Sequence, residues 1–486
     1  MAEAVFELLS IFTPNLREEL NLLSGVREDI EYIKGEFERM THFLRVADAI
    51  EDRDPQIKVW VKQVREAAYD TADALDMYML RLRHHHSTGF REFVQDCLID
   101  HWRLILLWVA EGFIEVKEGM TREEVAEGYL NELMNRSLVQ VTEVRGDGRF
   151  KAYRIHDLWR ELIIAKSREQ NIVTIAIERG RAWPEKLRRL SVHHNLEDIQ
   201  QSKGARLLTV LDLTGAQLET FPHEVVSLLN LTYLSLRATN VKMIPKSIGK
   251  LKKLETLDLK QTNVTELPDE ILKLQHLRHL LLYRYNENQC YFPFHGTIGF
   301  KAPAGIGNLF YLQKLCAIEV NEGNNSGIVL REVGKLTQLR RLFILRLQKE
   351  DGTVLCSSLE KLNNLLSLAI AAKEEDENID LDSLSLPPQL LRTLYLTGRL
   401  KWVRVESSSM PLLEELYLQD CKLMMELPSG VEHLANLRHL DLSDMSETLI
   451  SRLNRDLQGG DYWKIAHVPK VWVGNSKSGD WIGGYL

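Results

Sequence analysis

The histidines and cysteines of this sequence are poorly placed to bind a metal ion together. Three consecutive histidines, His84–His86, form the densest group. Three neighbours cannot all face one metal ion from a helix or a strand, so they indicate a polar linker. The five cysteines include no Cys-x-x-Cys pair, which argues against a zinc site or a disulfide framework and favours a reducing compartment. These cysteines are Cys97, Cys290, Cys316, Cys356 and Cys421.

Groups for nucleophilic or phosphate chemistry are also missing from the sequence. A phosphate-binding loop needs Gly-x-x-x-x-Gly-Lys-Ser/Thr, whose backbone N–H groups surround the phosphates while lysine neutralises them. The nearest string, Ile248-Gly-Lys-Leu251, lacks the hydroxyl residue. Histidines such as His193, His194 and His279 lie within repeats, and no nucleophile is placed beside them by spacing. The sequence therefore predicts no enzyme and no bound cofactor.

Length and charge narrow the class of protein further. A chain of 486 residues should divide into about three folded units. The formal net charge of −8 and the pI near 6.1 give no electrostatic basis for binding nucleic acid. The apolar N-terminus carries Glu3 and Glu7 and lacks a basic region, which favours an amphipathic helix over a signal peptide. We therefore expect a cytoplasmic protein.

The second half of the chain repeats one pattern, Leu-x-x-Leu-x-Leu. Its central leucines Leu211, Leu234, Leu257 and Leu280 recur every 23 residues. A proline follows eleven residues after each of the first three. One such copy cannot bury its leucines alone, whereas stacked copies form one continuous core under a curved parallel sheet. The pattern predicts a leucine-rich-repeat solenoid over 181–486, closed by a C-terminal cap and interrupted by an insertion at 283–304.

The variable positions of the repeats should line the concave side of this sheet. Aromatic and arginine side chains on a rigid concave surface are typical of protein interfaces. The alternative is that several of them only solvate the sheet. The candidate interface residues are Tyr233, Arg278, Arg340, Arg341, Arg392, Tyr395, Tyr417 and Arg438.

The first part of the chain predicts helices and then a β-hairpin. Residues 1–83 have apolar positions at helical spacing and predict an antiparallel helical bundle, followed by a linker at 84–93. Within 94–180, a helix should end near Gly112, and Thr121 with Glu124 forms a capping box for the next. Two β-rich segments then flank the turn at 145–148. Together the segments predict a multidomain α plus α/β chain with a winged helix between bundle and solenoid.

Winged helices often bind DNA, so the charge of these helices matters. They carry Glu111, Glu123, Glu124, Glu127 and Glu132, which is the wrong charge for a DNA groove. We therefore expect no binding to nucleic acid.

Three motifs resemble plant coiled-coil nucleotide-binding leucine-rich-repeat receptors. The segment Trp60–Asp76, with Asp73 and Asp76, resembles the acidic helix of their N-terminal domain. The run 107–113 and the triad Ile155-His156-Asp157 resemble their winged helix, with Ile155 in place of methionine. The resemblance implies that His156 faces the β-phosphate of bound ADP and that Asp157 holds the turn in its resting shape.

The resemblance also implies partners and a mode of action. Family members carry a P-loop module between the helical domain and the winged helix, where this chain has only 84–93. We therefore expect a truncated intracellular immune receptor that acts through protein contacts, without ADP or ATP. Its partners would be a pathogen effector or guarded host protein, and other receptor chains joined through the N-terminal helices.

Other implications concern docking, the membrane and two alternatives. The acidic helix should dock on arginines that share one position in the repeats, and the first helix should contact the plasma membrane only on activation. The alternatives are an ADP/ATP-dependent switch with a residual site and a winged-helix nucleic-acid binder. The docking arginines are Arg188, Arg278, Arg340, Arg392 and Arg438.

Overall fold

The computed structural model describes most of the chain beyond residue 98. The bundle at 1–83, the linker at 84–93, Asp73, Asp76, His156, Asp157 and Arg188 lie outside the described residues. The described residues are 99–136, 138–144, 150–155, 174–176, 189–192, 208–285, 297–320, 326–372, 379–380, 384, 387–398, 400–401, 410–422, 424–455, 457, 459–477 and 480–486.

Within the described residues, the predicted winged helix contains two helices and a three-stranded sheet ordered β1-β3-β2. Thr121 accepts a hydrogen bond from the backbone N–H of Glu124, whose carboxylate accepts one from the Thr121 N–H, so the predicted capping box is confirmed. Gly112 follows the first helix with φ of +73°, a conformation that favours glycine. The elements are β1 Ile99–Asp100, α5 His101–Ala110, α6 Arg122–Asn135, β2 Val139–Val144 and β3 Phe150–Ile155.

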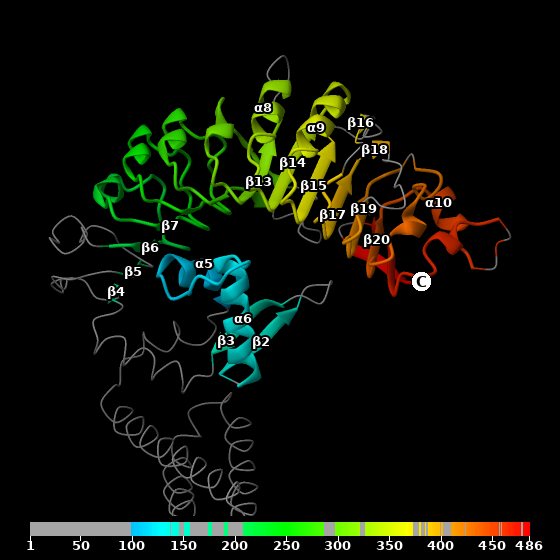
Figure 1. The fold of residues 1–486 in the computed structure, drawn as a ribbon, viewed down its shortest axis with the longest axis horizontal. Coiled ribbons are helices and arrows are strands. Elements are labelled where there is room, and N and C mark those ends of the chain that lie inside the picture. The colour runs from blue at the N-terminus through cyan, green and yellow to red at the C-terminus, as the bar shows by residue number, and fades with distance from the viewer. Residues whose placement is uncertain are drawn as a thin grey trace, which may run out of the picture. The chain divides into compact units, whose positions relative to one another are not determined.

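A single 15-stranded sheet runs through the repeats (Figure 1). Its strands pair in parallel except for β22, which closes the C-terminal end by pairing antiparallel with β21. The strands are β4 Thr174–Ala176, β5 Arg189–Val192, β6 Val210–Asp212, β7 Tyr233–Ser235, β8 Thr256–Asp258, β9 His279–Leu281, β12 Phe300–Lys301, β13 Lys314–Glu319, β14 Arg341–Leu347, β15 Ser367–Ala372, β17 Thr393–Thr397, β19 Glu415–Gln419, β20 His439–Ser443, β21 Lys470–Lys477 and β22 Asp480–Tyr485.

Two short strand pairs and a series of helices complete the solenoid. The pair β10–β11 lies within the insertion at 283–304, and α8 and α9 lie on the convex side of the sheet (Figure 1). The remaining elements are β10 Arg284–Tyr285, β11 Thr297–Ile298, β16 Ile379–Asp380, β18 Leu400–Lys401, α8 Ser326–Val333, α9 Gly352–Leu359, α10 Glu447–Arg452, and the 3₁₀ helices η4 His223–Ser227, η5 Lys246–Lys250, η6 Asp269–Lys273, η8 Ile306–Asn308, η9 Lys349–Asp351, η10 Val431–His433 and η11 Tyr462–Lys464.

The repeated prolines and leucines each have one structural role. Pro222, Pro245 and Pro268 immediately precede η4, η5 and η6, where a residue without an N–H loses no helical hydrogen bond. The central leucines are paired in register along β6 to β9 and are fully buried. Each repeat thus adds a layer to one continuous core, as the 23-residue spacing predicts.

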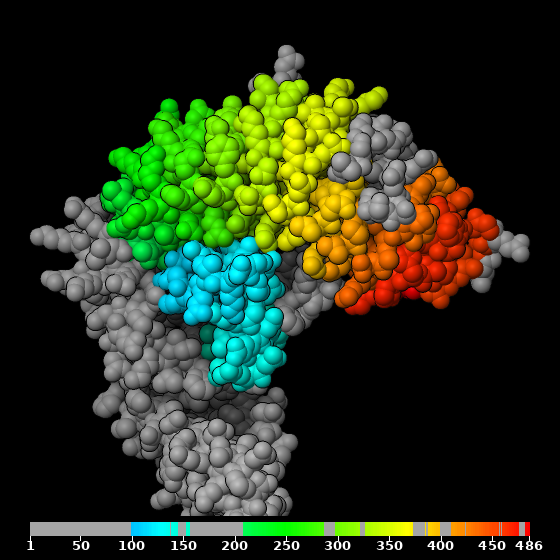
Figure 2. Space-filling model, viewed as in Figure 1, coloured from blue at the N-terminus to red at the C-terminus, as the bar shows by residue number. Residues whose placement is uncertain are grey.

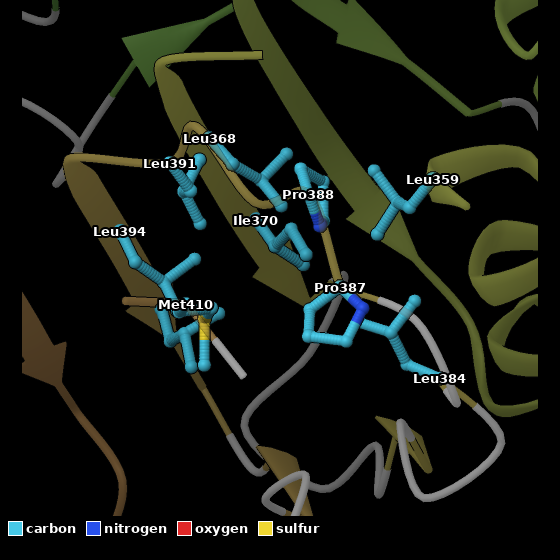
Figure 3. Close-up of a pocket in the computed structure, with 10 residues that line it drawn as sticks. Leu359, Leu368, Ile370, Leu384, Pro387, Pro388, Leu391, Leu394 and Met410 are labelled. Atoms are coloured by element: carbon cyan, nitrogen blue, oxygen red, sulfur yellow. The ribbon is translucent and has the colours of Figure 1, made fainter. Parts of the chain in front are cut away.

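The core of the solenoid contains a small apolar cavity. Figure 3 shows an apolar cavity between β15 and β17, with Leu368, Leu391 and Met410 on its wall. Its volume of about 20 Å³ would admit one water molecule, but the lining offers no polar partner. Among the described residues, no cluster of three metal-ligating side chains occurs, and no helix is long and apolar enough to cross a membrane.

Candidate protein-interaction site on the concave sheet

The concave side of the sheet presents aligned rows of side chains. In the first repeats the pairing aligns Asp212, Ser235, Asp258 and Leu281 along one row. In the last repeats it aligns Tyr395, Tyr417, Asp441 and Trp472. Both rows lie at the same point of the repeat, between the two inward leucines of Leu-x-Leu or, at Trp472, between Val471 and Val473. They define an N-terminal half, β6 to β14, and a C-terminal half, β15 to β21, of one surface.

Helix α5 covers part of the N-terminal half (Figure 2). Leu106 packs against Val210, Tyr233, Leu281 and Cys316, and Tyr233 is consequently fully buried. This apolar contact stabilises the docked helix by removing hydrocarbon surface from water.

Polar contacts surround the apolar contact of α5. Arg103 Nε donates to Asp212 Oδ2 at 2.9 Å. Asp100, just before α5, lies 3.4 Å from Arg237. The Lys314 ammonium lies 3.2 Å from the centre of the Trp102 ring, a cation–π contact. These contacts position α5 along the row that contains Asp212.

Helix α6 adds two carboxylates to the same half of the sheet. Glu123 is buried and lies 3.0 Å from Arg278 and 3.3 Å from Nε2 of His279. Glu124 receives a 2.9 Å hydrogen bond from Arg340. Burial alone would raise the pKa of Glu123, but His279 and Arg278 outweigh it and lower that pKa to about 2. Glu123 is therefore charged at neutral pH and electrostatically bound to the repeats.

His279 makes this contact sensitive to acid. Burial lowers the pKa of His279 to about 4, and Thr256 Oγ1 lies 2.9 Å from its Nδ1. Below pH 6.5 the unfolded chain takes up a proton that the native chain resists until about pH 4, so stability falls as pH falls across this window. Glu123 contributes nothing to this window, because its own stabilisation is lost only between about pH 4.5 and 2.

We predict that the titration of His279 lowers the free energy of unfolding by on the order of 1 kcal/mol between pH 7 and 5, a loss that Asp441, whose pKa is raised to about 6, partly offsets. Urea unfolding at several pH values would measure the slope. The His279→Gln variant should show a flatter profile over the same range, while His433→Gln, which alters an exposed histidine, should keep the wild-type profile. Equal slopes in wild type and His279→Gln would contradict the assignment.

In the C-terminal half, the row between the inward-facing residues contains two adjacent aromatic side chains. The rings of Tyr395 and Tyr417 stack with centroids 4.1 Å apart, and both side chains remain half-exposed. Asp441 follows in the same row and accepts a hydrogen bond from Ser443 Oγ. Burial raises the pKa of the Asp441 carboxyl to about 6, although the Ser443 hydrogen bond opposes the shift.

The structure divides the predicted interface residues into two groups. All of the described ones belong to the strands of the sheet or directly precede them. Tyr233, Arg278 and Arg340, however, contact α5 and α6, which bury Tyr233 completely and pair with the two arginines. Arg341 pairs in register with Lys314, and Arg392 lies 2.6 Å from Glu414. Tyr395, Tyr417 and Arg438 remain at least partly exposed.

The triad predicted to sense ADP is only partly described. Ile155 ends β3 and is half-buried, while His156 and Asp157 lie outside the described residues.

Sequence reasoning missed Asp212, Lys314 and Asp441, each of which faces the concave side. A signal was present for the two aspartates, because both stand in the variable position of Leu-Asp-Leu, followed by a hydroxyl residue.

Comparisons with family models place three adjacent modules on the chain. The leucine-rich repeat region matches residues 186–451, the Rx N-terminal domain matches 4–101, and the disease resistance protein winged helix domain matches 93–163. The first match alone covers more than half of the chain and defines a leucine-rich-repeat protein. With the other two, it shows that the chain belongs to the family of plant disease resistance proteins that combine these modules.

Curated relatives agree with this assignment. The chain is 30% identical to disease resistance protein RPM1 of Arabidopsis thaliana over 467 residues, covering 76% of this chain and 50% of that protein. It is 43% identical to putative disease resistance RPP13-like protein 2 of the same plant over 106 residues, 22% of this chain and 12% of the relative. The chain thus spans about half the length of RPM1 and a smaller share of the other relative.

Solved leucine-rich-repeat structures also align with the chain. One is the leucine-rich-repeat protein LIC12759 of Leptospira interrogans, with a TM-score of 0.34 and 21% identity over 59% of this chain and 78% of that one. The assignment rests on the sequence comparisons and not on this alignment.

Proposed function

We propose that the chain acts in plant defence by protein recognition, with the C-terminal half of the concave sheet as its contact surface. The observation that carries the proposal is the division of that surface. Helices α5 and α6 occupy the N-terminal half through Arg103 and Glu123, while the stacked Tyr395 and Tyr417 remain partly exposed in the other half. Rigid aromatic pairs on a concave surface are typical centres of binding energy.

The kind of partner follows from the family. A pathogen effector or a guarded host protein would bind the repeats, and other receptor chains would join through the N-terminal helices. The proposed location is the cytoplasm, with plasma-membrane contact only on activation. The proposal includes no catalytic reaction and no binding of nucleic acid. Glu123 and Glu124 of α6 contact arginines of the repeats instead.

Recognition by the repeats predicts that the tyrosine pair is needed to hold a partner. In leaf tissue, the full chain carrying Tyr395→Ala and Tyr417→Ala should lose its cross-linked protein partners by about tenfold or more, because both variants remove aromatic contact area. Lys361→Ala, an exposed substitution after α9, is the matched control and should capture partners like the wild type. Capture at wild-type yield by the double variant would exclude this surface.

Because the proposed function does not use a nucleotide switch, a second prediction concerns bound nucleotide. The purified, folded chain should release far less than one equivalent of ADP or ATP when denatured, measured by chromatography. A variant with His156→Ala should give the same low value, because no phosphate-binding loop is present to hold the nucleotide. Stoichiometric ADP in the wild type, reduced by this substitution, would instead support the alternative of a nucleotide-dependent switch with a residual site.

A further inference from the structure

Two repeats place an aspartate and a hydroxyl group in the same local arrangement. Asp212 is followed at the second position by Thr214, and Asp441 is followed in the same way by Ser443. Asp212 Oδ1 accepts from Thr214 Oγ1 at 2.6 Å, and Asp441 Oδ1 accepts from Ser443 Oγ. Both aspartates are buried, with 4% and 5% of their surface exposed. The two hydroxyl groups therefore hold the two carboxylates in matching orientations on the concave side.

The first of these sites is filled by an arginine from α5. Nε and Nη2 of Arg103 both donate to Oδ2 of Asp212, the oxygen not used by Thr214. Tyr233, from the neighbouring strand, contributes to the electrostatic environment of the guanidinium. The Asp212 site thus shows that an aspartate at this position of the repeat can bind a guanidinium group.

The second site has no cation. Among the described residues, no lysine, arginine or histidine forms an ion pair with Asp441, and its raised pKa is explained by burial opposed only by Ser443. Burying a carboxylate without a positive partner is unfavourable in free energy. A guanidinium group of a partner protein would offset this unfavourable term.

Aromatic rings flank the Asp441 carboxylate on both sides. The strand register places Tyr417 on β19 and Trp472 on β21 directly beside Asp441. Tyr395 stacks on Tyr417, and Tyr485 packs edge-on against Trp472 with ring centroids 5.2 Å apart, so both rings are held in place. Aromatic faces attract guanidinium groups, which stack on them more readily than ammonium groups do.

Two hydrogen-bond donors near Asp441 also lack an acceptor. Trp472 Nε1 and Gln419 Nε2 have no partner among the described residues, and Gln419 is only 4% exposed. Gln419 pairs in register with Ser443, which places its amide beside the Asp-x-Ser arrangement. A protein segment would supply backbone carbonyl oxygens for both donors.

We propose that Asp441, Tyr417 and Trp472 form a site for an arginine side chain of a partner protein, held as Arg103 is held by Asp212. The site lies in the surface assigned to recognition above, so this inference rests on the proposed function and names the chemistry of the partner.

The test uses the full chain and a defined probe. N-acetyl-arginine methylamide would be titrated into protein labelled with 5-fluorotryptophan, and the fluorine NMR signal of Trp472, assigned with Trp472→Phe, would report binding. The neutral isostere N-acetyl-citrulline methylamide is the matched ligand control. We expect a saturable shift with the arginine probe and no saturation with citrulline.

Variants then distinguish the contribution of the Asp441 carboxylate to binding from the contribution of the aromatic rings. Asp441→Asn should weaken binding of the probe about tenfold, because it removes the charge while keeping the shape. Tyr417→Leu should weaken binding severalfold with the carboxylate intact, because it removes one ring. Asp420→Asn, which changes an aspartate already 2.9 Å from Lys422, should bind like the wild type. Equal binding of citrulline, or unchanged affinity in both Asp441→Asn and Tyr417→Leu, would overturn the inference.

The outcomes also distinguish this inference from the proposed function. If the arginine probe does not bind while the tyrosine double variant still loses its partners, only the arginine site is excluded. If the probe binds at Asp441 while capture of partners does not depend on the tyrosines, the site exists and the proposed function is excluded.

Discussion

Replacing Glu123 with alanine is expected to destabilise the docking of α6 on the repeats by about 3 kcal/mol. The substitution leaves Arg278 without the carboxylate that lies 3.0 Å away, and the arginine side chain is only 16% exposed. Arg278 would keep Glu255, at 3.5 Å, as a weaker carboxylate partner. The loss of the nearer partner of a mostly buried charge still costs more than the loss of an exposed ion pair, which rarely contributes more than about 1 kcal/mol. Urea unfolding followed by the fluorescence of the nine tryptophans would measure the loss of stability.

A matched control for this prediction lies on the same helix. Glu132 pairs with Arg136 four residues later, and both side chains are more than half exposed. Glu132→Ala should therefore change stability by less than about 1 kcal/mol. Hydrogen exchange over 122–135 should accelerate in Glu123→Ala and stay unchanged in Glu132→Ala. Similar exchange in the two variants would show that Glu123 does not hold α6 to the sheet.

Replacing Leu257 with alanine is expected to lower the free energy of unfolding by about 3 kcal/mol. Leu257 is fully buried at the centre of β8 and pairs in register with Leu234 and Leu280, so the substitution leaves a cavity between two layers. In a solenoid each repeat is stabilised mainly by its neighbours, and the loss should therefore weaken both adjacent interfaces. Thermal unfolding followed by circular dichroism would measure it.

Leu229 provides the control for the leucine prediction. It belongs to the neighbouring repeat and is 55% exposed, so Leu229→Ala removes the same atoms without creating a cavity. We expect a change within about 0.5 kcal/mol. A comparable loss in both variants would mean that burial in the layered core does not determine the contribution of these leucines.

Two acidic residues of the winged helix bind arginines of the repeats. Their charge argues against a DNA-binding function at the level of sequence. In the structure, Glu123 and Glu124 contact Arg278 and Arg340, which belong to the set of arginines expected to receive an acidic helix. The acidic helix expected there was Trp60–Asp76, which lies outside the described residues, so that expectation stays a prediction.

The sequence by itself determined the solenoid, because contacts in a repeat protein are close in the chain. Each leucine packs against its counterpart 23 residues away, so the period, the buried positions and the prolines before the 3₁₀ helices can all be predicted. The capping box at Thr121 was predictable for the same reason, since its partner Glu124 is three residues away.

Only the tertiary structure decided which part of the concave surface is open. Glu123 and Arg278 are 155 residues apart, and Arg103 and Asp212 are 109 apart, separations that no repeat period encodes. Tyr233 and Tyr417 occupy concave positions in the same pattern, yet Tyr233 is fully buried under α5 while Tyr417 remains half-exposed. The variable positions of a repeat identify the side chains that face the concave side. Whether those side chains meet α5, α6 or a partner depends on where distant segments pack.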